Sequence, residues 1–213
     1  MLNHMQPNAH LQQRARLSRP IQQNELEGVV WQDFVLEKAV FSELDFCAPS
    51  QCSAKCEVDQ PPAIFHRVLF KQVTFNACTL RQHHFVECQF VGCAFVKCDL
   101  SHSQFAQCEM QQCSFTDCDL NHTKLLHSQS QGVVFTQCSL SGSQFIQNQL
   151  KEGAWLSCEV AGAQVEQNTL ESYALNEIDF STLTWTNNSL SQVMMLNCQW
   201  QHCHFSDAQW QFC

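Results

Sequence analysis

The 213-residue chain lacks the features that mark membrane and secreted proteins. It has no apolar run of about 18 residues, and no basic start followed by an apolar stretch and a small-residue cleavage site. These absences predict a chain that has no membrane span and stays in the cytoplasm. Tyrosine is scarce, with one residue against 16 phenylalanines. Phenylalanine packs in an interior without a partner for a hydroxyl group, so the bias indicates stacked apolar rings.

Catalytic motifs are absent as well. The sequence contains no Gly-rich phosphate loop, no G-x-S-x-G elbow and no H-E-x-x-H pair, and its ten histidines are scattered. We therefore expect no enzymatic activity, no cofactor, no metal site and no small-molecule substrate.

What the sequence does contain is a five-residue period that runs without a phase slip from Ala63 to Cys213. Of the thirty repeat centres from Phe65 to Trp210, all but Ser130 are large and apolar. A small or thiol side chain lies two residues before most centres, and the other three positions are mostly polar. A period of five fits neither a helix nor a strand, so it predicts a solenoid in which each pentad forms one side of a coil.

The pattern resembles the pentapeptide repeat family, as in Cys98-Asp99-Leu100 and Cys113-Ser114-Phe115. The resemblance implies an all-β fold, a right-handed quadrilateral β-helix with four pentads per coil. Residues 63–213 would then form about 7.5 coils, and residues twenty apart should stack.

The sequence supports stacking at a distance of twenty residues. Residues 75, 95, 115 and 135 are all Phe, and a second column of asparagines predicts a buried amide ladder at Asn148, Asn168 and Asn188. The bulky Tyr173 follows Gly153 in its column, so volume is compensated. Ser130 interrupts a column of large centres, and there we expect a backbone bulge, a bound water or weak hydrogen-exchange protection.

The cysteines follow the same period. Twelve of the 15 occupy the small-residue position two before a centre, which predicts buried, reduced thiols rather than disulfides or zinc ligands. The other three, Cys47, Cys52 and Cys56, lie outside the register and are either reactive thiols, weak metal ligands or incidental. His102 and His122 should stack at one corner, with His202 farther along the same column. Solvated turn residues explain these histidines better than a metal site.

The first 62 residues divide into three segments. Residues 1–25 are polar and Gln-rich, compatible with a short helix over Ala9 to Ser18 or with disorder. Residues 26–46 carry a first coil on a shifted phase, with centres at residues 31, 36, 41 and 46. Residues 47–62 contain three prolines and lose the large centres, so we expect a loop ejected from the solenoid before the array 63–213 begins. Such a loop is either a functional element or a tolerated insertion.

Two outward columns are candidate partner-binding surfaces. The first is an acidic ridge; its predicted members are Asp99, Asp119, Glu159 and Asp179, with Asp117 and Glu177 at the edge. The second is an apolar column; its predicted members are Val86, Ala106, Leu126 and Ile146. The alternatives are that the acids keep the rod soluble and that the apolar side chains lean inward at a corner.

The C-terminal end is a third candidate. A solenoid end exposes strand edges and core, and this one is rich in aromatic residues: Trp200, Phe205, Trp210 and Phe212. We expect it to pack against a second copy in a homodimer or against a partner protein.

These observations favour a non-enzymatic protein–protein interaction scaffold with a partner of unknown identity. The resemblance and the net charge of −9 support a second hypothesis, an acidic DNA mimic that binds the type II topoisomerases, DNA gyrase or topoisomerase IV, as some family members do in fluoroquinolone resistance. The chain departs from that group in having no second loop within the array and no C-terminal dimerisation helix. Composition near residues 193–205 also resembles arrays found in proteins of bacterial type VI secretion, a third hypothesis.

Overall fold

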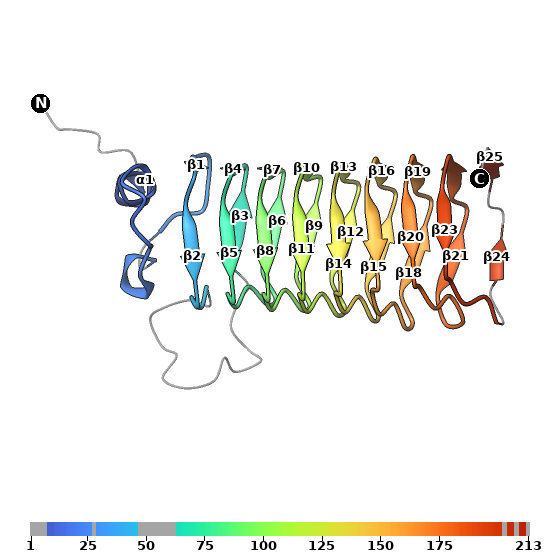
Figure 1. The fold of residues 1–213 in the computed structure, drawn as a ribbon. Coiled ribbons are helices and arrows are strands. Elements are labelled where there is room, and N and C mark those ends of the chain that lie inside the picture. Colours follow the sequence, from blue (N-terminus) through green and yellow to red (C-terminus); the bar gives the residue numbers. More distant parts are fainter. Residues whose placement is uncertain (1–7, 27–28, 47–62, 202–203, 207–208, 212–213) are drawn as a thin grey trace, which may run out of the picture.

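The chain forms a four-sided β-solenoid, shown in Figure 1. The structure is a computed structural model that describes residues 8–26, 29–46, 63–201, 204–206 and 209–211. Short parallel strands stack along one axis, with helix α1 (Ala9–Arg16) and the 3-10 turn η1 (Gln23–Glu25) at the N-terminal end. No helix in the described ranges is both long and apolar enough to cross a bilayer.

Three sides of the solenoid are parallel sheets of three-residue strands. The first is β1 (Val35–Glu37), β4 (Leu69–Lys71), β7 (Gln89–Val91), β10 (Glu109–Gln111), β13 (Gln129–Gln131), β16 (Gln149–Lys151), β19 (Thr169–Glu171), β22 (Ser189–Ser191) and β25 (Gln209–Gln211). The second is β2 (Val40–Ser42), β5 (Thr74–Asn76), β8 (Ala94–Val96), β11 (Ser114–Thr116), β14 (Val134–Thr136), β17 (Ala154–Leu156), β20 (Ala174–Asn176) and β23 (Met194–Leu196). The third is β3 (Ile64–His66), β6 (His84–Val86), β9 (Gln104–Ala106), β12 (Lys124–Leu126), β15 (Gln144–Ile146), β18 (Gln164–Glu166), β21 (Thr184–Thr186) and β24 (His204–Ser206).

The fourth side consists of single-residue bridges, such as those that join Asp99 to Asp119 and Ser139 to Glu159. Paired residues are twenty apart along the main array, for example Phe75 with Phe95. The predicted stacking of residues twenty apart, and with it the four-sided β-helix, is therefore confirmed.

The corners between sides use a left-handed backbone. From Arg67 to Asn197 nearly every fifth residue has a positive φ, and most of these residues are not glycine; Gln112, for example, has a φ of 52°. This conformation costs about 1–2 kcal/mol per non-glycine residue. Ladder hydrogen bonds at the corners offset the cost, as where the Gln112 amide donates to the Gln131 carbonyl at 2.8 Å.

The interior is a continuous apolar core built from columns. The rings of Phe75, Phe95, Phe115 and Phe135 stack with centroid distances of 4.6–4.8 Å. The cysteines of the small-residue position from Cys78 to Cys158 are buried and free. Each of their thiols donates to a main-chain carbonyl, as Cys98 Sγ does to Phe75 O at 3.4 Å. The thiols thus act as small core residues that also satisfy backbone acceptors.

Gly153 and Tyr173 compensate each other as predicted. Tyr173 is buried in a position where most coils have a small residue. A Cβ atom on Gly153 would lie 2.5 Å from Tyr173 Cε2 and 2.4 Å from Val133 O. No other residue type fits at position 153 without movement of the backbone.

Of the three outcomes expected at Ser130, the backbone bulge does not occur, and the bound water and the weak hydrogen-exchange protection remain predictions. Ser130 pairs in register with Met110 on one side and Leu150 on the other, without an extra residue in either strand. A cavity of about 20 Å³ lies in the core at this level, between apolar side chains of which Met110 is one. The strands of both neighbouring coils hold the Ser130 backbone in register.

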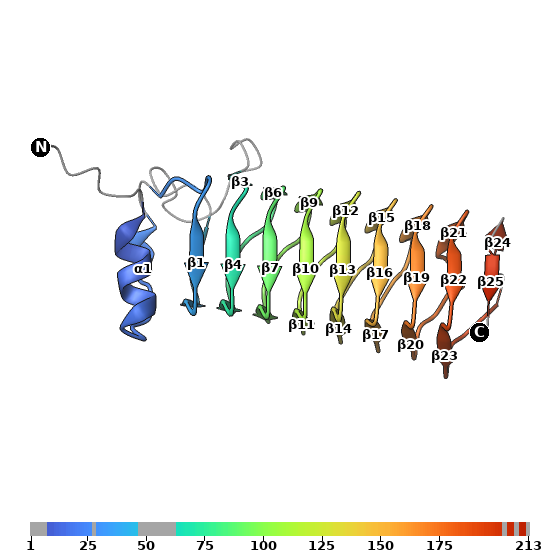
Figure 2. The same cartoon turned by 90° about the horizontal axis from the view of Figure 1, so that it is seen from above.

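The first coil stacks on the main array with a different register. Val35 pairs with Leu69 and Phe41 with Phe75, an offset of thirty-four residues. The ring of Trp31 packs on Phe65 at a centroid distance of 4.7 Å. Beyond this coil, α1 lies directly before β1 along the axis, as Figure 2 shows, and buries Leu11 and Ala15.

Candidate protein-interaction surfaces

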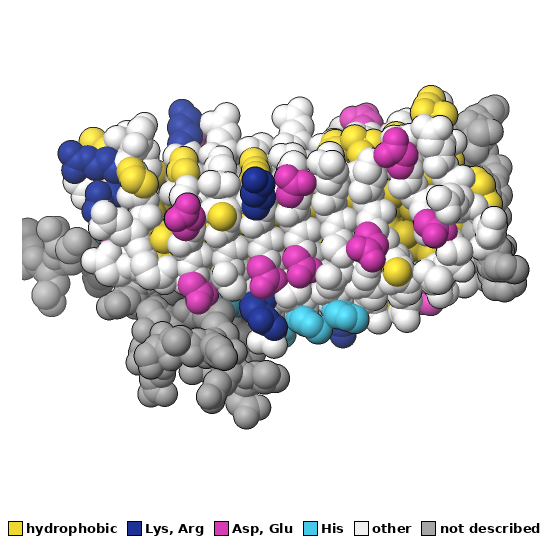
Figure 3. All heavy atoms as spheres, turned by 60° about the horizontal axis from the view of Figure 1, so that its bottom comes forward, with side chains coloured by type: hydrophobic (Ala, Val, Ile, Leu, Met, Phe, Trp, Pro, Cys, Tyr) yellow, Lys and Arg dark blue, Asp and Glu magenta, His cyan; other side chains and the backbone are white. Residues whose placement is uncertain are grey.

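The acidic ridge occupies the fourth side of the solenoid. Bridges stack Asp99 on Asp119 and continue through Ser139 to Glu159, and Asp179 stacks on Gln199. Apart from Asp99, which is half-buried, these acids are exposed, as are Asp117 and Glu177 at the adjoining corner. Figure 3 shows acidic side chains following this line along the rod. The structure therefore brings the predicted ridge residues to one region.

Local hydrogen bonds fix the orientation of several ridge carboxylates. Asp99 Oδ1 accepts bonds from the Ser101 amide at 3.0 Å and from its hydroxyl at 2.6 Å. Asp179 Oδ1 accepts the Ser181 amide at 2.9 Å, and its hydrogen bonds with the Ser181 backbone and side chain lower the pKa of the Asp179 carboxyl. A carboxylate held in this way by the residue two positions later loses little freedom on binding.

Charge is unevenly distributed along the rod. Lys151 is the last basic residue of the sequence, and seven acidic residues follow it. Nearer the N-terminal end, Lys97 shares a corner column with Asp117 and interrupts the acidic line. The C-terminal third therefore has a net negative charge, whereas the ridge at Asp99 and Asp119 has basic neighbours.

The apolar column lies on the outer face of the third sheet. Val86 pairs with Ala106, and Leu126 pairs with Ala106 and Ile146, so the four side chains form one continuous line. All four are half-buried. They offer apolar contact area without being fully exposed, and the proposed partner-binding role remains a prediction.

Large exposed apolar side chains concentrate near the two ends. Among the described residues they are Leu17, Val30, Val35, Val40 and Ile64 at the N-terminal end and Met194, Leu196 and Trp200 at the C-terminal end. The Trp200 ring is 44% exposed and stacks on Phe180 at 4.7 Å. The side chains of Phe205, Trp210 and Phe212 lie outside the described set, as do His202 and residues 47–62 with Cys47, Cys52 and Cys56. The middle of the rod presents a mostly polar surface.

The predicted histidine stack is confirmed. The rings of His102 and His122 lie 4.8 Å apart at an angle of 19°. A Cβ atom on Gly142 would lie 2.5 Å from His122 Nδ1, so glycine makes room for the second ring. In the part of the chain that the structure describes, no group of three or more His, Cys, Asp or Glu side chains could hold a metal ion.

Sequence reasoning missed the residues that close the N-terminal end. The side chains of Asn8 and Gln23 each bond to both the amide and the carbonyl of one first-coil residue, Val30 and Asp45 respectively. Asn8 and Gln23 lie in segments without the pentad pattern, so no periodic signal marks them. Their amide groups reproduce the pair of bonds that another coil would make.

The sequence also matches a known protein family. A family model described as "Pentapeptide repeat region" matches residues 62–145 and 88–165. Curated protein sequences give no match.

The solved structures that are similar to the chain include QnrB1, HetL and Rfr23. QnrB1, a plasmid-mediated fluoroquinolone resistance protein, has 14% identity and a TM-score of 0.39, with 90% of this chain and 86% of that chain covered. HetL from the cyanobacterium Nostoc sp. has 11% identity and a TM-score of 0.39, with 84% and 88% covered. Rfr23 from the cyanobacterium Cyanothece has 13% identity and a TM-score of 0.27, with 71% and 94% covered. The unbroken pentad period, the four-sided solenoid and the family model agree, and the chain belongs to the pentapeptide repeat family.

Proposed function

We propose that this chain is a non-enzymatic scaffold that binds partner proteins through the outside of a rigid β-helix. The filled interior supports this proposal most directly. Inward side chains such as Phe95 and Leu120 are buried in a continuous core, and the core cavity near Met110 has about 20 Å³, room for about one water molecule. Other molecules can therefore bind only at the outer faces and the ends.

The surfaces offered for binding are the acidic ridge, the apolar column, segment 47–62 and the C-terminal end. Each outer column repeats at the ~4.8 Å strand spacing, which gives a partner a regular row of similar side chains. Little main chain needs to be ordered on binding, because the ladder hydrogen bonds already hold it.

Affinity capture from the source organism, followed by titration with the purified partner, tests the scaffold function. Leu126→Glu should weaken partner binding by at least about tenfold if the apolar column is used. Gln107→Glu, which adds the same negative charge at an exposed corner, serves as the control. If changes in the ridge, the apolar column and the C-terminal end all leave binding intact, the proposed surfaces are wrong.

A second function, mimicry of DNA, is supported by the charge of the C-terminal third. Between Glu152 and Gln201 the sequence has six acidic residues and no basic one. These fifty residues form two and a half coils, which corresponds to about 12 Å of rod at the strand spacing. One of the six, Glu171, is paired with Lys151 at 2.8 Å. The remaining five give roughly one charge per 2.4 Å, compared with one per ~1.7 Å of duplex DNA.

The partner class for this second function is a type II topoisomerase, and a DNA gyrase supercoiling assay tests it. Under this hypothesis the chain alters gyrase activity or its response to fluoroquinolones at micromolar concentration. Replacement of Asp99, Asp117, Asp119 and Glu159, together with Glu177 and Asp179 of the C-terminal third, by Asn or Gln should remove that effect without lowering the melting temperature. Binding should weaken steeply with salt. A wild-type chain without any effect on gyrase would rule out this function and leave the scaffold function standing.

A further inference from the structure

The N-terminal end of the solenoid is closed on three of its four sides. Asn8 Nδ2 donates to Val30 O at 2.6 Å, and Asn8 Oδ1 accepts from Val30 N at 3.2 Å. Gln23 makes the same pair of bonds with Asp45, at 2.6 and 2.8 Å. On the third side, Ile21 N donates to Val40 O at 3.4 Å and bridges to Phe41. These caps satisfy backbone groups that would otherwise form open strand edges.

The fourth side, strand β1, packs against α1 but keeps main-chain groups without hydrogen-bond partners. Phe34 O accepts from Leu69 N at 3.0 Å, and Lys38 N donates to Lys71 O at 2.8 Å. In a parallel ladder, residues alternate between the two neighbouring strands, so the N–H and C=O groups of Val35 and Glu37 point away from β4. No hydrogen bond satisfies these four groups in residues 8–26, 29–46 or 63–201.

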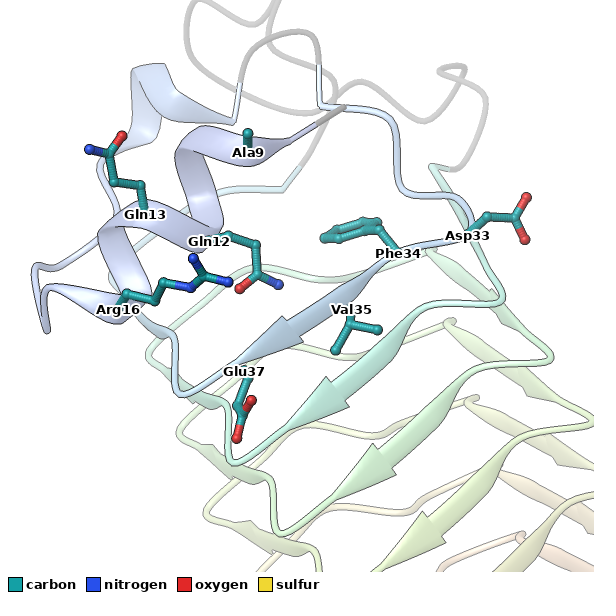
Figure 4. A pocket seen from close by; sticks show the side chains of 8 residues that line it. All are labelled: Ala9, Gln12, Gln13, Arg16, Asp33, Phe34, Val35 and Glu37. Atoms are coloured by element: carbon teal, nitrogen blue, oxygen red, sulfur yellow. The ribbon is translucent and has the colours of Figure 1, made fainter. Parts of the chain in front are cut away.

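A groove lies beside this edge of β1. One wall is formed by Ala9, Gln12, Gln13 and Arg16 of α1, and the other by Asp33, Phe34, Val35 and Glu37. Its volume is about 760 Å³, within the usual range for binding clefts. Figure 4 shows the α1 side chains on one side and Phe34, Val35 and Glu37 along the strand.

The side chains of the groove define what it would accept. Asp33 is bonded to Arg67, and Glu37 Oε1 lies 3.5 Å from Lys71 Nζ, so both carboxylates are already paired. Arg16 has no ion pair within the described ranges. Val35 is 48% exposed and Phe34 is half-buried, which adds an apolar strip. A free guanidinium favours a carboxylate.

We propose that the edge of β1 accepts an extended peptide segment of a partner protein as an added strand, with an acidic side chain paired to Arg16 and apolar side chains against Phe34 and Val35. Main-chain bonds to Val35 and Glu37 would provide affinity, and Arg16 would provide selectivity, as in other cases of β-strand addition. The proposal deepens the scaffold function by naming a peptide site that is separate from the acidic ridge.

Selection of random nine-residue peptides displayed on phage against the full chain tests the proposal. Enriched peptides should carry Asp or Glu together with β-branched residues, and their synthetic forms should bind the purified chain. Val35→Pro removes the edge amide, but not a ladder bond, because proline is tolerated where the N–H faces outward. It should weaken peptide binding by about tenfold, and Arg16→Glu should do the same.

Matched variants distinguish loss of the Val35 amide from loss of folding. Val35→Thr keeps the amide and should bind like the wild type, and Asp119→Asn on the ridge should also bind normally even if the ridge function fails. Melting temperatures of Val35→Pro and Val35→Thr establish that both are folded. Absence of enriched peptides, or equal binding by Val35→Pro and Val35→Thr, would overturn the proposal.

Two further results would assign the groove to another occupant and also overturn it. One is a tenfold gain in peptide affinity when residues 1–7 are removed, which would identify this chain's own N-terminal segment as the occupant. The other is a wild-type dimer in light scattering that Arg16→Glu dissociates, which would identify a second copy.

Discussion

Replacing Asn168 by alanine should open the amide ladder at its centre. The column of small-residue positions that contains Cys108 changes from thiol to hydroxyl to amide along the rod, and Asn148, Asn168 and Asn188 are all buried. Asn168 Oδ1 accepts from Asn148 N at 2.8 Å and from Asn148 Nδ2 at 3.0 Å. Asn168 Nδ2 donates to Phe145 O at 2.8 Å and to Asn188 Oδ1 at 3.1 Å.

The expected cost follows from these four bonds. A hydrogen bond contributes about 1 kcal/mol net, and a buried donor or acceptor left unpaired costs about 1–3 kcal/mol. Asn168→Ala leaves the Asn148 main-chain amide without a partner and removes the side-chain bond to the Phe145 carbonyl, which keeps its ladder bond to β18. We therefore expect a local loss of about 3 kcal/mol. Asn188 makes three such bonds, two to Asn168 and one to Val165 O, so Asn188→Ala should cost less.

Native-state hydrogen exchange at the Asn148 amide is the appropriate assay. Solenoid stability is a sum of local contributions, so a global melting temperature would dilute the effect. A loss of 3 kcal/mol corresponds to about a hundredfold faster exchange. Asn168→Cys is the matched control, because Cys108 in the same column donates to Phe85 O at 3.3 Å and a thiol at 168 can replace the bond to Phe145. Less than tenfold acceleration in Asn168→Ala would refute the reasoning.

Three other predictions concern the core, the pH dependence and the C-terminal end. Leu120→Asp should destabilise the array by several kcal/mol by burying an unpaired charge, whereas Gln112→Asp at an exposed corner should change thermal melting little; equal losses would contradict the assigned phase. Burial lowers the pKa of His83 below its usual 6.5, so the unfolded chain binds the proton more readily, and stability should fall as the pH drops below about 6.5 and stay constant above it. His83→Thr should abolish that slope in urea denaturation, and parallel curves would exclude His83 as its source. Met194→Asp and Leu196→Asp at the exposed β23 should prevent self-association in light scattering if the C-terminal end forms a homodimer; a wild type that is monomeric at high concentration leaves only the partner version.

The repeated part of the fold could be predicted because each residue's environment recurs every twenty positions. The Phe75 column, the asparagine ladder and the match of Tyr173 with Gly153 all follow from comparing residues twenty apart. The ridge and the apolar column could be predicted for the same reason, since an outward position is outward in every coil.

The remaining features depend on contacts that no period encodes. Asn8 and Gln23 act through single side chains far from their partners in sequence. The groove beside β1 exists because α1 lies against the first coil. Neither Gln12 nor Arg16 belongs to a sequence pattern that predicts this position. At Ser130 the expected bulge does not form, because the strands of the neighbouring coils hold the Ser130 backbone in register.

The register offset of the first coil has a consequence for how the chain can change in length. Val35 pairs thirty-four residues ahead, whereas Leu69 pairs twenty ahead, so fourteen residues between these coils do not count toward the stacking distance. Deleting fourteen residues within 47–62 would restore a single uniform period and leave every stacked pair in place. A foreign sequence inserted there would likewise be carried outside the stacking pattern. The position between the first two coils is thus a natural attachment point, where a tag or binding module can be exchanged without altering the rod that carries it.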